Sequence, residues 1–293
     1  MKKQQLFEHY DQRRHWGGVR SHSQYMSGLA WQGSKSCAGG GFQGSWILAS
    51  LPTPASEVYV EPFLGGAHIL LNKFPTKLEV ANDVDGLLIN LWRMCKKHPK
   101  ELKAMIDDTL YSEREFNKAM GCLSSSDDLQ RAWALLVVLK QRQFFFSTMP
   151  NSKWSLNVHL KQNPSLIWRS SMLDFAAVAE RLKNVQICER DGIDLMMQLA
   201  KYEQVDMYCD PPYPSTASSA CYDGGTIDVD RMTEALLAQK GRVALSGMND
   251  EWNHLGWRKI EFEKLQTVSH TTAKDNRRTE QLWMNYDEQG MRL

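Results

Sequence analysis

The sequence has neither a long hydrophobic run nor an excess of charge of either sign. Its longest apolar stretch, residues 133–139, is far shorter than the roughly 20 residues of a membrane-spanning helix. The formal net charge is +1, so a uniformly basic surface is excluded and any site for nucleic acid must be local. Residues 1–15 carry basic side chains but no apolar segment, and we therefore expect no signal peptide.

The six cysteines are scattered, and no two of them form a Cys-x-x-Cys pair. This spacing is typical of free thiols in a reducing compartment and argues against a disulfide framework or a zinc site. We therefore expect a cytoplasmic protein that needs no metal. Hydrophobic residues make up 42% of the chain and charged residues 24%, which excludes a disordered protein and indicates an ordinary globular one.

Short β-rich segments alternate with segments of helical spacing over much of the chain. We expect strands at 58–63, 77–80, 185–188, 205–209, 242–245, 257–264 and 281–286. Helices are expected at 67–73, 85–97, 192–201 and 229–239. Such alternation predicts an α/β fold, with a mostly parallel sheet between two layers of helices. The last two strands have no helix between them, so they are expected to form an antiparallel end.

The α/β alternation stops between about residues 98 and 180. Residues 129–173 contain no aspartate or glutamate, although the whole chain has 34 acidic residues. One interpretation is a buried helix at 129–141 followed by an ordinary loop. The other is a basic insertion with interleaved aromatic residues, which suits a phosphate backbone and unstacked bases. The candidate DNA-binding residues are Lys140, Arg142, Lys153, Trp154 and Lys161.

Four acidic residues follow expected strands, at Glu61, Asp83, Asp191 and Asp210. In an open α/β sheet, ligands bind beyond the carboxyl ends of the strands. Acids at several strand ends therefore suggest a ligand with several hydroxyl or amino donors. The alternative role for Asp83 and Asp191 is capping of the helices that follow them, and capping is compatible with ligand binding.

The strongest motif is Asp210-Pro211-Pro212-Tyr213, which follows the strand at 205–209. The two prolines fix the backbone and remove two N–H donors, so the turn presents carbonyl acceptors beside a carboxylate and an aromatic ring. That set suits a planar base with an exocyclic amine, which Asp210 and the Pro211 carbonyl can accept while Tyr213 stacks on the base. The alternative is a rigid turn without a ligand.

Together these segments resemble the DNA N6-adenine methyltransferases of the Dam-like (D12) class, especially its phage- and plasmid-type members. The resemblance covers roughly residues 36–287. It rests on VEPFLGGAHILL (60–71), ANDVDGLLINLW (81–92), ERDGIDL (189–195), CDPPY (209–213), GRVALSG (241–247) and RRTEQLWMNY (277–286). It implies the class I, Rossmann-like sheet of S-adenosylmethionine-dependent methyltransferases, with an inserted target-recognition region.

The resemblance also implies roles for individual residues. Asp210, Pro211, Pro212 and Tyr213 correspond to the catalytic motif. The S-adenosylmethionine site would include Gly39, Gly40, Glu61, Pro62, Phe63, Gly65, Gly66, Asp83, Asp191 and Asp210. The family usually has a Trp-x-Gly-Gly-Lys loop near its N-terminus. Aligned with Cys37–Gly41, that loop would have Cys37 in place of the tryptophan and Gly41 in place of the lysine; a second candidate is His15–Arg20.

The expected organisation is a basic N-terminal extension at 1–35, a catalytic domain at 36–97 and 181–293, and a target-recognition domain at 98–180. The expected reaction is direct transfer of a methyl group to the N6 amine of an adenine that has left the double helix. The expected partner is double-stranded DNA, together with a cognate restriction enzyme or a partner subunit. Three alternatives stay open: a weak or inactive DNA-binding relative, which the altered Cys37–Gly41 loop favours; a cytosine N4 methyltransferase; and an enzyme that acts on RNA.

Overall fold

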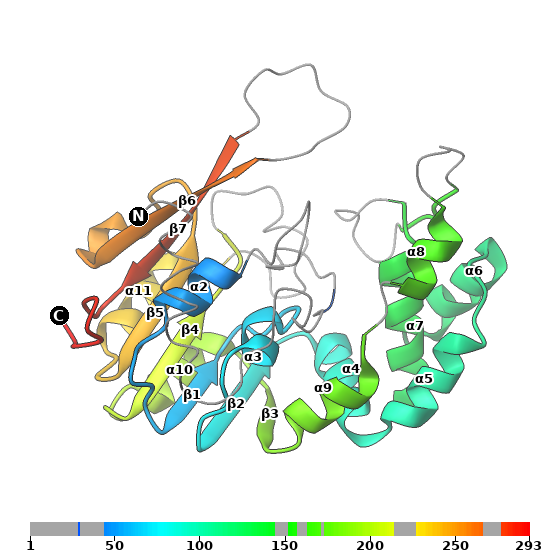
Figure 1. Cartoon of the computed structure of the whole chain (residues 1–293), viewed down its shortest axis with the longest axis horizontal. Helices are drawn as coiled ribbons and strands as arrows, with labels where there is room; N and C mark the ends of the chain where they lie inside the picture. Colours follow the sequence, from blue (N-terminus) through cyan, green and yellow to red (C-terminus); the bar gives the residue numbers. More distant parts are fainter. Residues whose placement is uncertain are drawn as a thin grey trace. The chain divides into compact units, whose positions relative to one another are not determined.

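The computed structural model describes residue 29 and residues 44–143, 152–156, 163–170, 173–213, 227–265 and 277–293. These residues form an α/β structure (Figure 1). Its strands are β1 (Val58–Glu61), β2 (Leu78–Asp83), β3 (Val185–Glu189), β4 (Val205–Cys209), β5 (Arg242–Gly247), β6 (Arg258–Leu265) and β7 (Arg277–Met284). Each expected strand is present, with its ends shifted by a few residues.

The strands form a seven-stranded sheet in the order β3-β2-β1-β4-β5-β7-β6. β4 lies between β1 and β5 and is parallel to both, whereas β7 is antiparallel to β5 and to β6. The predicted α/β fold with an antiparallel end is therefore confirmed. The order also makes β1 and β4 neighbours, so the segments after their carboxyl ends leave the sheet side by side.

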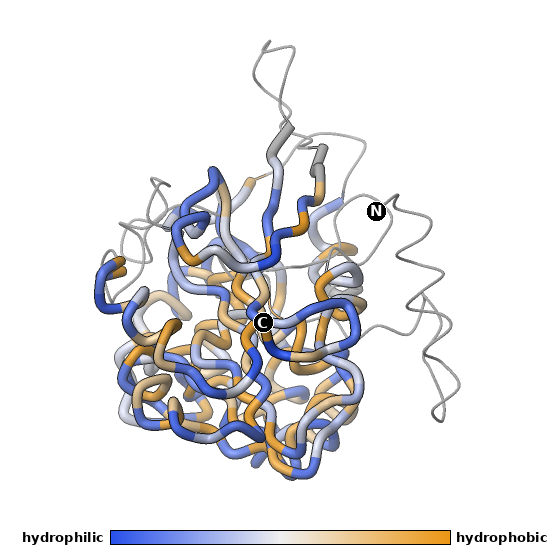
Figure 2. Tube along the Cα trace, turned by 90° about the vertical axis from the view of Figure 1, so that its left-hand side faces the viewer, coloured by the Kyte–Doolittle hydropathy of each residue, from blue (hydrophilic) through white to orange (hydrophobic). Residues whose placement is uncertain are grey.

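The chain divides into two compact units. Unit 1 contains residues 1–49, 64–75 and 81–189, and unit 2 contains residues 50–63, 76–80 and 190–293. In unit 2, the helices α10 (Gly192–Leu199) and α11 (Val229–Leu237) pack on β1, β4 and β5 through a core that includes Met196, Met207 and Leu236. Figure 2 shows the apolar residues along the inner segments of the described chain and the hydrophilic ones toward its outer loops.

The described part of unit 1 is mainly helical. Its helices are α2 (Ser45–Ser50), α3 (His68–Asn72), α4 (Gly86–Lys97), α5 (Pro99–Asp107), α6 (Glu113–Cys122), α7 (Asp128–Gln141), α8 (Pro164–Ser170) and α9 (Phe175–Leu182). The central helix is α7, which packs against α4, α5 and α6. Residues 132–139 of α7 are buried on every side, which explains why the longest apolar run of the sequence occurs there.

Aspartate and serine caps explain where several helices begin. The carboxylate of Asp127 accepts hydrogen bonds from the N–H groups of Leu129 and Gln130 at the start of α7. The Ser112 hydroxyl accepts one from Glu115 at the start of α6. Such caps satisfy backbone donors that have no partner within the helix.

The thiols are unpaired where the structure describes them, at Cys95, Cys122, Cys188 and Cys209. Burial raises the pKa of the Cys95 thiol, so that group is a small apolar side chain rather than a nucleophile. The described residues contain no cluster of histidine, cysteine, aspartate and glutamate side chains that could hold a metal ion.

Candidate active site

The catalytic motif lies at the carboxyl end of the fully buried strand β4. Asp210 follows Cys209 directly, and the Tyr213 hydroxyl donates a hydrogen bond to Asp210 Oδ1 over 3.0 Å. Pro211 is buried, whereas Asp210, Pro212 and Tyr213 are half-buried. The turn therefore folds back on itself and places the ring and the carboxylate together at the surface end of the strand.

A second carboxylate lies at the end of the neighbouring strand β1. Glu61 is only 2% exposed and accepts a hydrogen bond of 2.7 Å from the Tyr59 hydroxyl. Burial, with the Glu61 carboxylate beside it, raises the pKa of Tyr59 well above its ordinary value, so Tyr59 remains a donor. Burial raises the pKa of the Cys209 thiol, and the charges of Asp210 and Glu61 add to that effect. The two carboxylates therefore both lie close to the carboxyl end of β4.

The segment after Glu61 packs against the start of α10 in the same unit. A Cβ atom added to Gly192 would lie 2.6 Å from the Phe63 ring and 2.9 Å from the Pro62 carbonyl oxygen, so only glycine fits there. Asp191, the residue before it, caps α10 by accepting a hydrogen bond from Asp194 N over 2.9 Å. Unit 2 thus brings together Glu61, Pro62, Phe63, Asp191 and Asp210–Tyr213 from three distant parts of the sequence.

In unit 1, Asp83 is tied to the glycine turn that follows β1. Asp83 Oδ2 accepts a hydrogen bond of 2.8 Å from Gly65 N, and Asp83 Oδ1 accepts one of 3.1 Å from Asp85 N. Burial raises the pKa of Asp83, and the backbone N–H groups around it lower the pKa in part. The cap of α4 is Asp85, not Asp83. Capping therefore does not account for Asp83, although it does account for Asp191.

The glycine turn itself is tightly constrained. Gly65 and Ala67 both have positive φ angles, of 50° and 57°. Leu29 N donates to Gly66 O over 3.0 Å, and a Cβ atom on Gly66 would lie 2.5 Å from the Leu29 carbonyl oxygen. The Trp92 indole donates to Gly65 O. The fold itself therefore requires these glycines: Gly66 leaves room for the Leu29 carbonyl oxygen, and Gly65 adopts a positive φ angle.

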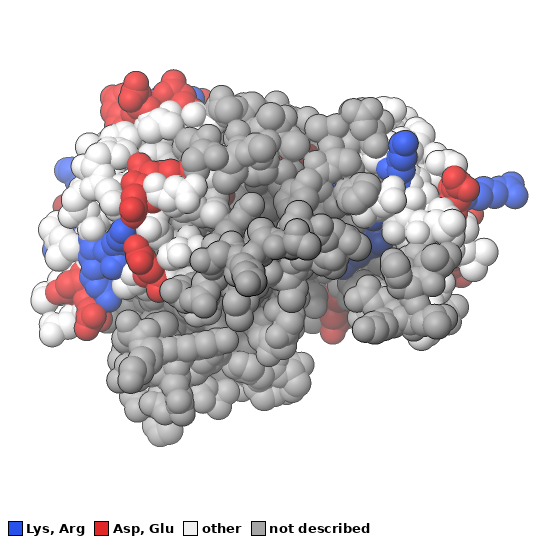
Figure 3. All heavy atoms as spheres, turned by 90° about the horizontal axis from the view of Figure 1, so that it is seen from above, with Lys and Arg blue, Asp and Glu red and all other residues white. Residues whose placement is uncertain are grey.

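Other predicted residues lie elsewhere or outside the described residues. Lys140, Arg142, Lys153 and Trp154 lie at the carboxyl end of α7 and in the short segment that pairs with it. Gly39, Gly40 and Lys161 lie outside the described residues. Figure 3 shows acidic and basic side chains side by side on the described part of one face, so no broad basic surface is seen there.

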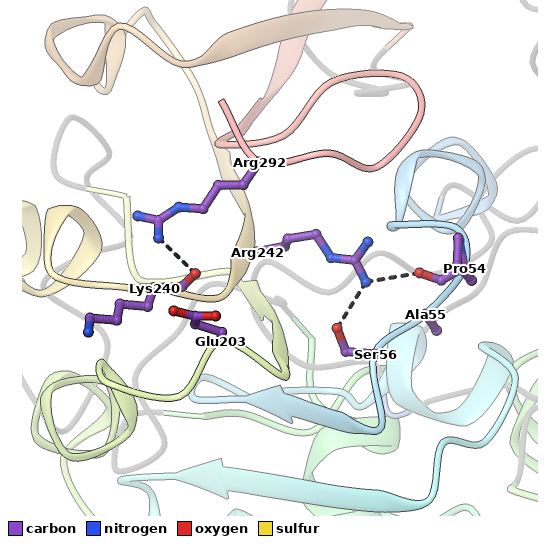
Figure 4. A pocket seen from close by; sticks show the side chains of 7 residues that line it. All are labelled: Pro54, Ala55, Ser56, Glu203, Lys240, Arg242 and Arg292. Atoms are coloured by element: carbon purple, nitrogen blue, oxygen red, sulfur yellow. Dashed lines mark hydrogen bonds between the residues drawn. The ribbon is translucent and has the colours of Figure 1, made fainter.

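A pocket of about 590 Å³ lies at the opposite, amino end of β4 and β5 (Figure 4). It is lined by Pro54, Ala55, Ser56, Glu203, Lys240, Arg242 and Arg292. The Arg242 guanidinium binds both oxygens of the buried Asp206 carboxylate, at 2.8 and 3.0 Å, and also donates to the Pro54 carbonyl oxygen. Because the donors of Arg242 are already used within the protein, this residue braces the structure, and the pocket is not the candidate active site.

The fold and the Asp-Pro-Pro-Tyr turn after β4 together define a methyltransferase of the α/β class. The sequence matches the family of D12 class N6 adenine-specific DNA methyltransferases over residues 31–242. The match covers more than half of the chain, and the chain therefore belongs to this family. No curated protein matches it. The protein is an adenine-specific DNA methyltransferase, and its substrate is DNA.

The matched region begins upstream of Cys37–Gly41 and includes a further candidate for the Trp-x-Gly-Gly-Lys loop. It begins at Trp31, and the residues from there are Trp31-Gln32-Gly33-Ser34-Lys35. They keep the tryptophan, the first glycine and the lysine of the Trp-x-Gly-Gly-Lys pattern, with serine in place of the second glycine. The spacing was visible in the sequence.

The helices that the structure describes are all too short or too polar to span a membrane.

Proposed function

We propose that the protein transfers the methyl group of S-adenosylmethionine directly to the N6 amine of an adenine that has been turned out of double-stranded DNA. The observation that carries this proposal is the Asp210–Tyr213 turn at the end of β4, beside the buried Glu61 at the end of β1. The turn offers two hydrogen-bond acceptors and an aromatic ring to one planar base.

The residues of each unit fit S-adenosylmethionine. In unit 1 the partly buried Asp83 carboxylate, held beside the turn after β1 by Gly65 N, can accept hydrogen bonds from ribose hydroxyls, and Gly65 and Gly66 next to it are further candidates. In unit 2 the candidates are Glu61, Pro62 and Phe63 with Asp191, which the close packing at Gly192 holds together. When bound, S-adenosylmethionine supplies an electrophilic methyl group on sulfur.

The chemistry of this chain is mainly positioning. The adenine amine is a weak nucleophile because its lone pair is delocalised into the ring. If Asp210 and the Pro211 carbonyl each accept one N–H of the amine, they favour a tetrahedral nitrogen whose lone pair points away from both acceptors. Tyr213 would stack on the base and replace part of the stacking that the base loses on leaving the double helix.

The N-terminal loop is part of the same proposal. We assign the cofactor-binding loop of the family to Trp31–Lys35, with Gly39 and Gly40 as further candidates beyond it. The cation at Lys35 would then interact with the carboxylate of S-adenosylmethionine. Lys35→Ala is expected to raise the KM for S-adenosylmethionine, whereas Arg20→Ala, which removes the cation of the alternative motif, is expected to leave it unchanged.

The proposed organisation follows the chemistry. Residues 36–97 and 181–293 form the catalytic domain, to which the extension at 1–35 contributes the loop Trp31–Lys35, and residues 98–180 recognise DNA through Lys140, Arg142, Lys153, Trp154 and Lys161. The acid-free sequence at 129–173 supports this assignment. We further propose that the enzyme acts in the cytoplasm and that a cognate restriction enzyme or a partner subunit accompanies it.

The test uses purified full-length protein, S-adenosylmethionine with an isotopically labelled methyl group, and unmethylated genomic DNA. The DNA is digested to nucleosides, and the label is located by mass spectrometry. Label in N6-methyladenine is expected. Label in N4-methylcytosine would show that the enzyme methylates cytosine instead of adenine. A parallel reaction with total RNA in place of DNA completes the test, and label in the RNA with none in the DNA would exclude DNA as the substrate.

The matched control compares two aspartates. Asp210→Asn keeps the shape of the side chain but replaces an acceptor oxygen by a donor, and it is expected to lower the transfer rate by at least about a hundredfold. Asp230→Asn, at an exposed position in the first turn of α11, is expected to leave the rate unchanged. An Asp210→Asn variant with the wild-type rate would contradict the proposed mechanism.

A further inference from the structure

The carboxyl end of α7 begins a two-stranded antiparallel pairing. Arg142 is the cap residue of α7 and pairs with Trp154. The hydrogen bonds flank this pair: Gln143 N donates to Lys153 O, and Ser155 N donates to Gln141 O, each over 2.8 Å. Arg142 and Trp154 are therefore a non-hydrogen-bonded pair, the arrangement in which opposite side chains lie closest and on the same face.

Neither side chain of this pair has an acceptor. Arg142 Nε and Trp154 Nε1 are both hidden from water and make no hydrogen bond. Among the described residues, no hydrogen bond or ion pair reaches the Arg142 guanidinium. Burial lowers the pKa of Arg142, and no carboxylate counteracts that effect. A cation that loses water without gaining an acceptor costs free energy, and a bound anion recovers it.

The pair is held in place by residues from the start of α6. The Tyr111 hydroxyl donates to Ser155 O over 2.6 Å, and its ring lies 5.6 Å from the Trp154 ring at a tilt of 48°. Gln141 fixes the other side, since its Nε2 donates to Leu110 O over 3.0 Å. The backbone of the pair is thus braced, and because Nε and Nε1 are covered, an anion reaches the two donors only when these half-buried side chains turn outward.

We propose that Arg142 and Trp154 together bind one phosphate group of the DNA backbone. This inference rests on the proposed function, because it assumes that residues 98–180 contact DNA. A phosphate suits the pair for two reasons. A phosphate supplies the negative counter-charge that is missing beside the guanidinium. It also has enough acceptor positions for an arginine N–H and an indole N–H at once.

The major-groove edge of a guanine, with its N7 and O6 acceptors, is the commonest base contact of an arginine, and it fits less well. It is neutral, so it would leave the charge of Arg142 uncompensated, and it needs an arginine that reaches into the groove. Arg142 instead sits at the base of the pairing, half-buried and close to the helix end. A contact of this kind fixes the position of the DNA and does not read its sequence.

The test measures DNA affinity as a function of salt. Fluorescence anisotropy is recorded with two labelled duplexes, one that the enzyme methylates and one of shuffled sequence, at several potassium chloride concentrations. Arg142→Gln is expected to weaken binding to both duplexes roughly tenfold. It should also reduce the slope of log affinity against log salt by about 0.9, the value for one phosphate. Trp154→Phe removes the indole N–H and should weaken both equally, with the slope unchanged.

Two further variants serve as controls. Arg114→Gln removes the same charge from an exposed position on α6 and should change neither affinity nor slope. Arg142→Lys keeps the charge and should keep the slope. The thermal midpoint of Arg142→Gln should equal or exceed that of the wild type, because a charge without a counter-charge is removed.

Three results would overturn the phosphate assignment. In the first, Arg142→Gln binds DNA with wild-type affinity and salt slope. In the second, Arg142→Gln loses affinity only for the duplex that the enzyme methylates, and the salt slope is unchanged. In the third, Arg142→Gln has a much lower thermal midpoint, but its folded fraction binds DNA as the wild type does. The second result would indicate guanine recognition. The proposed function is tested separately, because it fails if the wild-type protein forms no N6-methyladenine, whatever Arg142 does.

Discussion

Replacing Tyr213 separates two roles that one side chain would play in the catalytic turn. Its hydroxyl donates to Asp210 Oδ1 over 3.0 Å, and its ring is proposed to stack on adenine. Tyr213→Phe removes only the hydroxyl. A hydrogen bond to a charged acceptor is worth about 1.5–3 kcal/mol when buried, and this one is half-exposed. We therefore expect Tyr213→Phe to raise the activation free energy of methyl transfer by about 1 kcal/mol, which lowers the transfer rate by up to about fivefold.

Tyr213→Ala also removes the ring. Stacking of one base on an aromatic side chain is worth about 1–3 kcal/mol, so the rate should fall by a further 5- to 150-fold or so. The assay is a single-turnover measurement with labelled S-adenosylmethionine and excess enzyme, which reports the transfer step rather than product release.

The comparison of the two variants decides the question. If Tyr213→Ala transfers methyl groups as fast as Tyr213→Phe, the ring does not stack on the base and that part of the mechanism is wrong. Tyr202→Ala is the matched control, because Tyr202 is 39% exposed and lies before β4 in the same unit. It should transfer at the wild-type rate.

Three further predictions concern stability. Burial lowers the pKa of Lys140 to about 8 from 10.5, so the folded protein gives up that proton before the unfolded chain does. The free energy of unfolding should then rise by up to about 3 kcal/mol between pH 8 and 10.5, and urea titrations should show no such rise for Lys140→Met. Arg242→Met leaves the buried Asp206 carboxylate without its cation and should cost about 3–5 kcal/mol, much of which Asp206→Leu in the same chain should restore. Gly66→Ala forces its Cβ against the Leu29 carbonyl oxygen and should lower the free energy of unfolding by about 1–3 kcal/mol while raising the KM for S-adenosylmethionine.

The strands and the catalytic turn were predictable because local sequence determines them. β4 is apolar except for Asp206 and is followed by Asp210 and two prolines, and β1 is apolar up to Glu61 and is followed by Pro62. Signals of this kind need no knowledge of distant residues. The order of the strands, which makes β1 and β4 neighbours, was not predicted, because the family resemblance implied only the class of sheet.

The helices between 98 and 180 were largely missed, although some of their signals were present. Pro99 begins α5, and Ser112 with Glu115 has the spacing of a helix cap at the start of α6. The interpretation of 129–141 as a buried helix was right, since α7 covers Asp128–Gln141. That result is compatible with DNA binding at its carboxyl end, so the two interpretations of this segment were not exclusive.

Contacts between distant residues could not be predicted. No sequence pattern shows that Tyr111 packs against Trp154, or that Leu29 lies on the turn at Gly66. The role of Asp83 was likewise ambiguous, because an acid before a helix is a cap as often as a ligand. Only its hydrogen bond with Gly65 distinguishes it from Asp85, the true cap.

The pairing of β1 with β4 also has a consequence for synthesis on the ribosome. Val58 pairs with Val205, 147 positions later in the chain. Because the ribosome adds about 5–20 residues per second, the edge of β1 that pairs with β4 stays unpaired for roughly 7–30 s. The helices from α4 to α9 contact mainly one another, so they can form during that interval. A nascent chain of this protein therefore exposes an unpaired apolar strand beside an already folded helical region, and that strand edge is where we expect aggregation or chaperone binding to occur.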